Sequence, residues 1–270
     1  MDLKDRIEEL WLKTSFDSSD REVFDQFKKL LQSGEVRAAT PSGRNWIVNK
    51  WVKKGILIGF RMGQIVKMSW SENKVFYDKD TFPERSFEPD YGIRMVVGGS
   101  SVREGAFVAR DVIMMPPMYI NVGAYIDSGC MIDSHALVGT CAQVGKDVHL
   151  SAASQLGGVL EPITANPVII EDGVFIGGNC GIYEGVIVGE KAIIAAGVVI
   201  TSSTVIYDSV NELLIRKPEN GPLRIPENSV TVPGVRPLRS NPNYSISCPI
   251  IIKYRDEKSD SSVVFEQELR

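Results

Sequence analysis

Carboxylates are the main side chains in this chain that could do acid–base chemistry, because its 270 residues include only two histidines. Asp133, in the run Asp133-Ser134-His135, is a candidate general base, a role that contributes about 10²–10⁴-fold to a rate. The alternative is a turn aspartate that bonds its own backbone, as we expect for Asp127. Glu184 is a second candidate, and its alternative is a solvated turn acid. Asp133 and Glu184 are therefore the predicted catalytic residues.

Arginines are the candidates for holding an acidic substrate, since a guanidinium forms paired hydrogen bonds with a carboxylate. Arg94 and Arg103 can both bind in this way, and Arg103 is the weaker choice because arginines are common on surfaces. The four cysteines lack metal-binding spacing, and two histidines are too few for a three-histidine zinc site. No metal is therefore predicted. Lys146 follows Gly145, but the glycine spacing does not match a phosphate-binding loop.

A repeat of six residues positions these candidates. Neither a helix, with a period of 3.6, nor a strand, with a period of two, explains it. A parallel β-helix does, because each short strand and its turn form one side of a triangular coil of about 18 residues. The alternative is a β-sandwich with coincidental spacing, which so many matches make improbable. The seventeen aliphatic or methionine positions are Val102, Val108, Met114, Ile120, Ile126, Ile132, Val138, Val144, Leu150, Leu156, Ile170, Ile176, Ile182, Val188, Ile194, Ile200 and Ile206.

Residues 18 apart in such a coil lie one above the other. The break between Leu156 and Ile170 holds eight residues more than one repeat, so we expect an extruded loop at 157–169 that keeps the register. One corner then forms a lane of mostly small residues, made of 133–135, 151–153, 177–179 and 195–197. A long, thin ligand such as pantetheine could lie in this lane, with the loop beside it; the alternative is close packing of two β-helix subunits. The predicted cofactor-binding residues are Ser151, Ala153, Ala195 and Ala196.

The sequences on either side of the repeat differ from it. Residues 2–33 hold two amphipathic helical patterns, residues 46–60 and 67–77 look like strands or short mixed elements, and residues 82–91 look like a loop. After Ile206 the chain is expected to be irregular and rich in proline, with a strand at Ile250–Tyr254 and frayed or lightly docked last residues. The predicted division is an N-terminal helical α/β domain (1–100), a β-helix (101–208) and a C-terminal region (209–270).

Composition excludes several other classes of protein. The net charge of -4 argues against a nucleic-acid binder, which would need a clustered basic face. The longest apolar run, 192–200, is far below the roughly 20 residues that span a bilayer. The first ten residues are too charged for a signal peptide. With four scattered cysteines, a reducing cytoplasm is the expected compartment.

Three segments resemble one enzyme family closely. They are MIDSHALVGTCAQVGKDVHLSA at 131–152, GGVLEPITANPVIIEDGVFIG at 157–177 and YEGVIV at 183–188. These segments are similar to those of the tetrahydrodipicolinate N-succinyltransferases, which belong to bacterial lysine and diaminopimelate synthesis. The resemblance runs from about residue 102 to 207, with weaker matches toward both ends. The hexads alone would indicate only the broad hexapeptide acyltransferase superfamily.

The resemblance implies a homotrimer of left-handed β-helices with active sites between subunits. It implies transfer of succinyl from succinyl-CoA to the amino group of a ring-opened dicarboxylate, with no tightly bound cofactor. Asp133 then matches the family aspartate, Arg94 matches an arginine that binds the substrate carboxylate, and the lane lies where relatives bind coenzyme A. This chain departs from the family at Gly181, where many relatives have a glutamate implicated in catalysis, and Glu184 matches only their later glutamate. His135 stands where an aromatic is common, which favours a pocket wall.

The sequence is also compatible with other functions. The nearest is the same acceptor with acetyl-CoA as donor. The depth of the pocket selects the length of the acyl group, and one methylene changes the binding free energy by only about 1–3 kcal/mol. No cation for the succinyl carboxylate can be located in the sequence. A non-catalytic β-helix scaffold is another, although the polar variety at outward positions argues against it. A carbonic-anhydrase-like zinc site is disfavoured because it needs three histidines. No nucleic acid or membrane partner is predicted.

Overall fold

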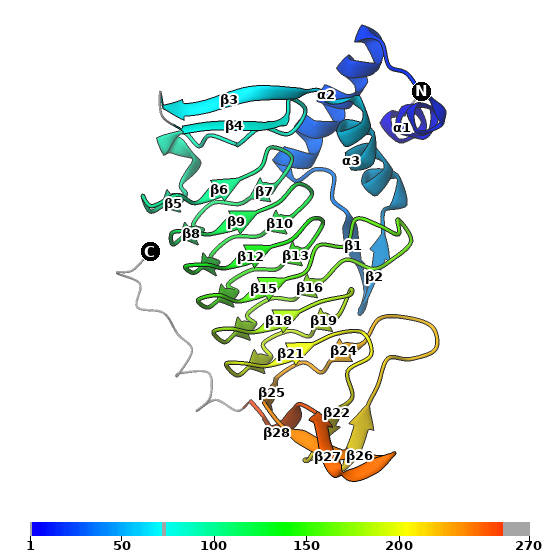
Figure 1. Cartoon of the computed structure of the whole chain (residues 1–270), viewed down its shortest axis with the longest axis vertical. Helices are drawn as coiled ribbons and strands as arrows, with labels where there is room; N and C mark the ends of the chain where they lie inside the picture. Colours follow the sequence, from blue (N-terminus) through cyan, green and yellow to red (C-terminus); the bar gives the residue numbers. More distant parts are fainter. Residues whose placement is uncertain (1, 72–73, 256–270) are drawn as a thin grey trace.

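The computed structural model describes residues 2–71 and 74–255, and Figure 1 shows a stack of short strands with the helices at one end and the last strands of the chain at the other. The stack has three faces of parallel strands, named here in chain order. Face 1 holds β6 (Ser101–Val102), β9 (Tyr119–Ile120), β12 (Leu137–Val138), β15 (Gln155–Leu156), β18 (Gly181–Ile182) and β21 (Val199–Ile200). Face 2 holds β7 (Phe107–Val108), β10 (Tyr125–Ile126), β13 (Gln143–Val144), β16 (Ile169–Ile170), β19 (Ile187–Val188) and β24 (Arg224–Ile225).

Face 3 is the longest sheet. It holds β5 (Arg94–Met95), β8 (Ile113–Met114), β11 (Met131–Ile132), β14 (His149–Leu150), β17 (Phe175–Ile176), β20 (Ile193–Ile194) and β25 (Ser229–Val232). Beyond β25 it continues through β28 (Ile250–Tyr254), β22 (Ile206–Asp208) and the antiparallel β23 (Leu213–Ile215).

The core of the coil is the row of repeat positions. Each two-residue strand turns its second residue inward, and all seventeen predicted positions are buried, none more than 4% exposed. Small residues that stand four places after some of these positions, such as Ala106 and Ser154, are buried as well. The predicted left-handed β-helix is therefore confirmed, with the hydrophobic stack as its stabilising interior.

The coil keeps its register across the extruded loop. Met131 pairs with His149, eighteen residues further along, whereas Gln143 pairs with Ile169, twenty-six residues further along. The eight additional residues leave the coil at the corner between faces 1 and 2. Beyond the loop the predicted stacking resumes on the same sides.

Within residues 2–71 and 74–79, the structure has three helices and two hairpins. The helices are α1 (Leu3–Leu12), α2 (Ser18–Ser33) and α3 (Lys50–Met62), and the hairpins are β1–β2 (Ala39–Ser42, Asn45–Val48) and β3–β4 (Ile65–Ser71, Lys74–Lys79). A capping box between Asp17 and Asp20 begins α2, and Gly34 at φ 81° follows its end. The two helices expected in 2–33 are confirmed. The strands or short mixed elements expected in 67–77 are strands in β3 and β4, and residues 72–73 lie outside the described residues.

The expectation of strands or short mixed elements at 46–60 is wrong for most of that segment, which forms α3. Gly55 and Gly59 lower the helix propensity of this stretch. Packing requires them, because a Cβ at Gly55 would lie 2.6 Å from the ring of Phe27, and one at Gly59 would lie 2.5 Å from the ring of Phe24. The close approach of α2 to α3 thus outweighs the local preference.

The loop expected at 82–91 is present, with one short 3₁₀ turn at Pro89–Tyr91. The strand at Ile250–Tyr254 is confirmed, but the expectation of irregular chain after Ile206 is wrong. The chain returns to the coil as β24 and β25, and β26 (Val235–Leu238) pairs with β27 (Asn241–Ser247). The excursion between β22 and β24 breaks the hexad count and hides this return. The expectation for the last residues falls at 256–270, outside the described residues. Among the described residues, no helix is long and apolar enough to span a membrane.

Candidate active site

The corner between faces 3 and 1 is the predicted lane. Backbone hydrogen bonds connect its turns from coil to coil: Ala153 N donates to Ser134 O at 2.8 Å, Asn179 N to Ala152 O at 2.9 Å, and Gly197 N to Gly178 O at 2.9 Å. The four turns therefore form one continuous strip parallel to the coil axis.

Most side chains along the lane are small, so its surface is smooth. Ser151, Ala153 and Ala195 are half-buried and Ala196 is exposed. At Gly177 a Cβ would lie 2.5 Å from Ala196 N, so the close stacking of these two turns needs glycine. What the lane offers to a ligand is mostly backbone.

Asp133 lies at the start of this lane, with its side chain 30% exposed. Its Oδ1 accepts a hydrogen bond from Ser134 N at 3.0 Å, which is the turn contact considered as an alternative role. The same contact is present at Asp127, where Ser128 N donates to Oδ1 at 2.8 Å. The second oxygen of Asp133, Oδ2, has a different neighbour, so the turn contact engages only one of the two carboxylate oxygens.

That neighbour is His149, which is not among the predicted site residues. His149 Nε2 lies 3.6 Å from Asp133 Oδ2, and the histidine side chain is 13% exposed. Its ring meets the Phe175 ring edge-on at 5.0 Å between centroids. Burial lowers the pKa of His149, and the Asp133 carboxylate opposes that shift. The signal in the sequence was the 18-residue stacking of Met131 under His149, which brings His149 beside the turn that follows Met131.

Arg94 lies on the same face as these residues. It pairs with Ile113, and Ile113 pairs with Met131. Two strand spacings amount to about 10 Å, and the Arg94 side chain is exposed. One chain thus presents Arg94 and Asp133 on the same side of the coil.

Arg103 has another position. It follows β6 at the corner between faces 1 and 2, forms an ion pair with Asp78 of β4, and lies over the Phe60 ring at 5.6 Å. This contact ties the β3–β4 hairpin to the coil. The structure does not bring Arg103 to Asp133 within one chain.

Glu184 also lies at the corner between faces 1 and 2, in a left-handed turn with φ 54°. It accepts hydrogen bonds from Ser202 N at 3.1 Å and from Ser202 Oγ at 2.6 Å. One chain therefore keeps Glu184 and Asp133 at different corners of the coil.

The extruded loop borders the corner of Glu184. Lys53 Nζ donates to Ala165 O at 2.6 Å, and Asn166 Nδ2 donates to Gly185 O at 3.1 Å. A cavity of about 620 Å³ lies between this loop and the turns that carry Tyr183, Glu184 and Ser202. These contacts hold the loop across face 1 from the lane, so in one chain it does not cover the lane.

Tyr183 fills the space beside Gly181. A Cβ at Gly181 would lie 2.3 Å from the Tyr183 ring, and the Tyr183 hydroxyl donates to Gln155 Oε1 at 2.8 Å. A larger side chain at 181 would therefore require the tyrosine to move. Where many relatives have a glutamate, this chain has Gly181, and the Tyr183 phenol lies beside it on the outer surface of face 1.

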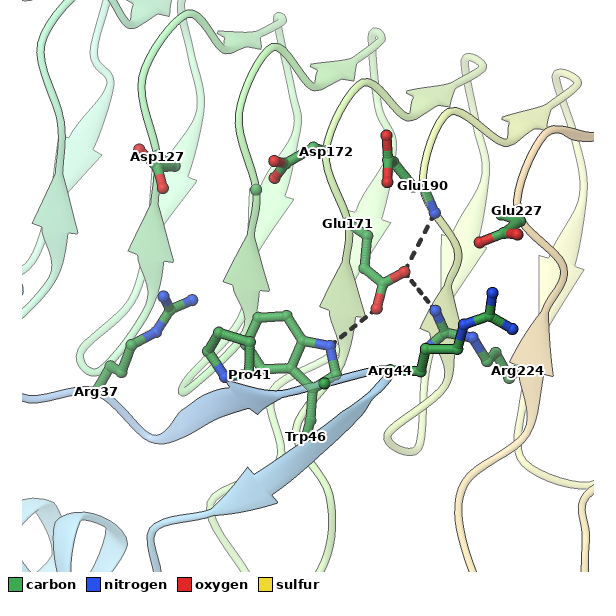
Figure 2. A pocket seen from close by; sticks show the side chains of 12 residues that line it. Arg37, Pro41, Arg44, Trp46, Asp127, Glu171, Asp172, Glu190, Arg224 and Glu227 are labelled. Carbon is green, nitrogen blue, oxygen red and sulfur yellow. Dashed lines mark hydrogen bonds and ion pairs between the residues drawn. The ribbon is translucent and has the colours of Figure 1, made fainter.

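A second cavity, of about 380 Å³, lies at the corner between faces 2 and 3 (Figure 2). The β1–β2 hairpin closes one side, where Trp46 Nε1 donates to Glu171 Oε1 at 2.9 Å and Arg224 pairs with the same carboxylate. Five carboxylates and three arginines line it, which disfavours an anionic ligand. None of the predicted site residues is among them, and the contacts attach the N-terminal part to the coil. The lining acids and arginines are Asp127, Glu171, Asp172, Glu190, Glu227, Arg37, Arg44 and Arg224.

Two of the cysteine thiols are unsuited to nucleophilic chemistry. Burial raises the pKa of Cys130 and of Cys141 to about 12. Among the described residues, no group of three or more histidine, cysteine, aspartate or glutamate side chains could hold a metal ion.

Comparison with known proteins gives concordant matches along the chain. Residues 2–62 match the tetrahydrodipicolinate N-succinyltransferase N-terminal family, and residues 167–202 match the hexapeptide repeat of succinyl-transferase. The 2,3,4,5-tetrahydropyridine-2,6-dicarboxylate N-succinyltransferase of Edwardsiella ictaluri is 45% identical over 262 residues, which cover 94% of this chain and 90% of the relative. That of Citrobacter koseri is 42% identical over 266 residues, with the same coverage.

A crystal structure of a Campylobacter jejuni protein, described as a candidate 2,3,4,5-tetrahydropyridine-2-carboxylate N-succinyltransferase, also matches. It is 18% identical with a TM-score of 0.48, and the match covers 90% of this chain and 64% of that one.

Proposed function

Because this chain belongs to the tetrahydrodipicolinate N-succinyltransferase family, we propose that it uses Asp133 to transfer a succinyl group to 2,3,4,5-tetrahydropyridine-2,6-dicarboxylate. The enzyme is an acyltransferase with small-molecule substrates. The observation that carries this function is the identity of 38–45% with N-succinyltransferases over 94% of the chain. That span includes the N-terminal helices as well as the coil.

The proposed donor is succinyl-CoA, bound along the lane as a co-substrate. The lane supports this assignment because its backbone groups lie along one strip, as the amides of pantetheine require. Ser151, Ala153, Ala195 and Ala196 are the residues proposed to contact the coenzyme. No tightly bound cofactor is needed for acyl transfer from a thioester.

The proposed role of Asp133 follows from the bonds that change. The amine nitrogen of the ring-opened acceptor attacks the thioester carbonyl, the C–N bond forms, and the C–S bond breaks to release the coenzyme A thiolate. The nitrogen must lose a proton in this sequence, and the thiolate gains one. Asp133 is suited to receive the proton because its Oδ2 is not held by the turn.

The acceptor carries two carboxylates, for which we propose Arg94 as the main partner. It is exposed on the face that carries Asp133, and a guanidinium binds a carboxylate through two parallel hydrogen bonds. Arg103 is a weaker proposal, because Asp78 already holds it in one chain.

We propose a homotrimer with each active site between two subunits. The separation of Asp133 and Glu184 in one chain supports this arrangement, since a neighbouring subunit could bring a second carboxylate to the lane. The same arrangement would allow a neighbour's extruded loop to cover the lane. Glu184 is then the second proposed catalytic residue.

We also propose a cytoplasmic location and a place in lysine and diaminopimelate synthesis. All four cysteines are free and buried, which suits a reducing compartment. The pathway follows from the reaction of the relatives.

An assay of the purified protein with each acyl donor tests the function. Coenzyme A release is followed with the tetrahydropyridine dicarboxylate as acceptor and either succinyl-CoA or acetyl-CoA as donor. We expect transfer from succinyl-CoA to exceed transfer from acetyl-CoA at least tenfold in kcat/KM, since a site that pairs the succinyl carboxylate would reject a donor without it. Equal or greater acetyl transfer would overturn the choice of donor, and no transfer from either would overturn the function.

A further inference from the structure

His149 and Asp133 approach each other from neighbouring coils. His149 is the outward residue of β14, and its partner in β11 is Met131, two residues before Asp133. The approach is therefore built into the coil register and does not depend on a flexible loop.

The two side chains differ in exposure. The Asp133 side chain is 30% exposed and opens onto the lane, while His149 is 13% exposed and lies behind it. The acid is thus the member of the pair that a ligand can reach. His149 is placed to act through Asp133.

The surroundings of His149 hold its ring in place. Its neighbours in the outward row of face 3 are Met131 and Phe175, both uncharged, and the Phe175 ring meets it edge-on. The charged group that raises its pKa is Asp133, and burial outweighs that effect. A neutral imidazole retains one N–H to donate.

Each oxygen of the Asp133 carboxylate has its own neighbour, and His149 is the neighbour of Oδ2. Ser134 N holds Oδ1 at 3.0 Å, whereas Oδ2 has His149 Nε2 at 3.6 Å. That distance is longer than a well-formed hydrogen bond. Contacts between catalytic groups are often long without substrate and shorten in the reactive complex.

We propose that His149 is a positioning residue for Asp133, donating from Nε2 to Oδ2 and holding the carboxylate toward the lane during acyl transfer. This inference rests on the proposed function of Asp133. It assigns His149 no contact with substrate or coenzyme.

Two substitutions separate positioning from packing. His149→Gln keeps a side-chain N–H that can reach Asp133 Oδ2, and His149→Phe keeps a ring against Phe175 without any donor. We expect His149→Phe to lower kcat about tenfold with the KM for succinyl-CoA within twofold of wild type. His149→Gln should recover most of that loss. Thermal unfolding of both variants gives the control for folding.

A double substitution tests whether His149 acts through Asp133. In an Asp133→Asn background, His149→Phe should cause no further loss of kcat, because the group that it positions is already gone. An independent further loss, or an equal loss in the glutamine and phenylalanine variants, would overturn the inference.

The outcomes for the two proposals are distinguishable. A His149→Phe enzyme with wild-type kcat, beside an impaired Asp133→Asn enzyme, overturns only the positioning role. A wild-type protein that transfers no succinyl group overturns the function itself. An Asp133→Asn enzyme with wild-type kcat overturns the assignment of Asp133 and the inference with it.

Discussion

The two oxygens of Asp133 have different surroundings, and this difference governs what the residue can do. Oδ1 is held by Ser134 N, which fixes the turn, while Oδ2 faces His149 and the lane. Asp127 makes the same turn contact at another corner. Comparing variants of Asp133 with variants of Asp127 therefore separates the effect of losing the turn contact from the effect of losing the proposed general base.

Asp133→Asn should lower kcat about 10²–10⁴-fold, because the amide cannot accept the proton that a general base must take. The substitution keeps an oxygen for Ser134 N, so the turn and the oligomer should persist. Steady-state kinetics with succinyl-CoA measure the effect. Asp127→Asn is the matched control, with the same turn contact away from the lane, and it should retain wild-type activity. A similar loss in both variants would mean that the turn, rather than the base, is responsible.

Residues were predicted from the sequence to different extents. Asp133 could be proposed from the sequence because its type and turn position suit a base and because the family resemblance supports it, and its catalytic role stays a prediction. His149 was not among the predicted site residues because the sequence gives stacking but not the direction of a side chain, and only the structure shows its ring beside Asp133. The contact of Tyr183 with Gln155 was missed for the same reason.

The elements of the coil were easier to predict than those that pack against it. A hexad repeat fixes strand, turn and inward face together, so β6 to β21 follow from a single period. Helix α3 did not, since its glycines satisfy contacts with α2 that lie outside its own sequence. The later strands β24 and β25 were missed because the excursion before them interrupts the period.

A buried carboxylate, Asp208, adds a side-chain contact to the C-terminal strand β28, which also pairs with β25 and β22. Tyr254 Oη donates to Asp208 Oδ2 at 2.6 Å, and Asn211 Nδ2 donates to the same oxygen at 2.8 Å. Burial alone would raise the pKa of Asp208, but these hydrogen bonds outweigh it and hold that pKa below its usual value. The contact links β22 to β28 in the sheet of face 3.

Asp208→Asn should therefore destabilise the protein in a pH-dependent way. A carboxyl whose pKa is lower in the folded state contributes stability that is complete above its unfolded value, about 3.9, and is lost as the pH falls through the folded value. The loss at pH 7 should be roughly 1–3 kcal/mol, as for hydrogen bonds to a charged group. Thermal unfolding from pH 7 to pH 3 checks this, since the gap between wild type and variant should narrow below pH 4. A constant gap would contradict it.

At the scale of the whole molecule, a single chain brings only some of the groups proposed for the site to its own lane, so the proposed site needs a second chain. Asp133 and Arg94 lie on one side of the coil, whereas Glu184 and the extruded loop lie at another corner. In a ring with threefold symmetry, each lane would meet a corner of the next subunit. The proposed trimer follows from this need for a second chain, and light scattering should give three times the 29.8 kDa of one chain.

Hybrid trimers test the shared site directly. Asp133→Asn and Glu184→Gln should each abolish most activity, since each removes one carboxylate from every site. A trimer made of both kinds of subunit contains one interface with an intact Asp133 facing an intact Glu184. Refolding the two variants together should therefore restore activity to at most about one third of wild type in each hybrid trimer. The separately refolded variants, mixed afterwards, are the control and should stay inactive. If co-refolding restores nothing while light scattering shows hybrid trimers, the two carboxylates do not meet across an interface, and Glu184 serves only its bond to Ser202.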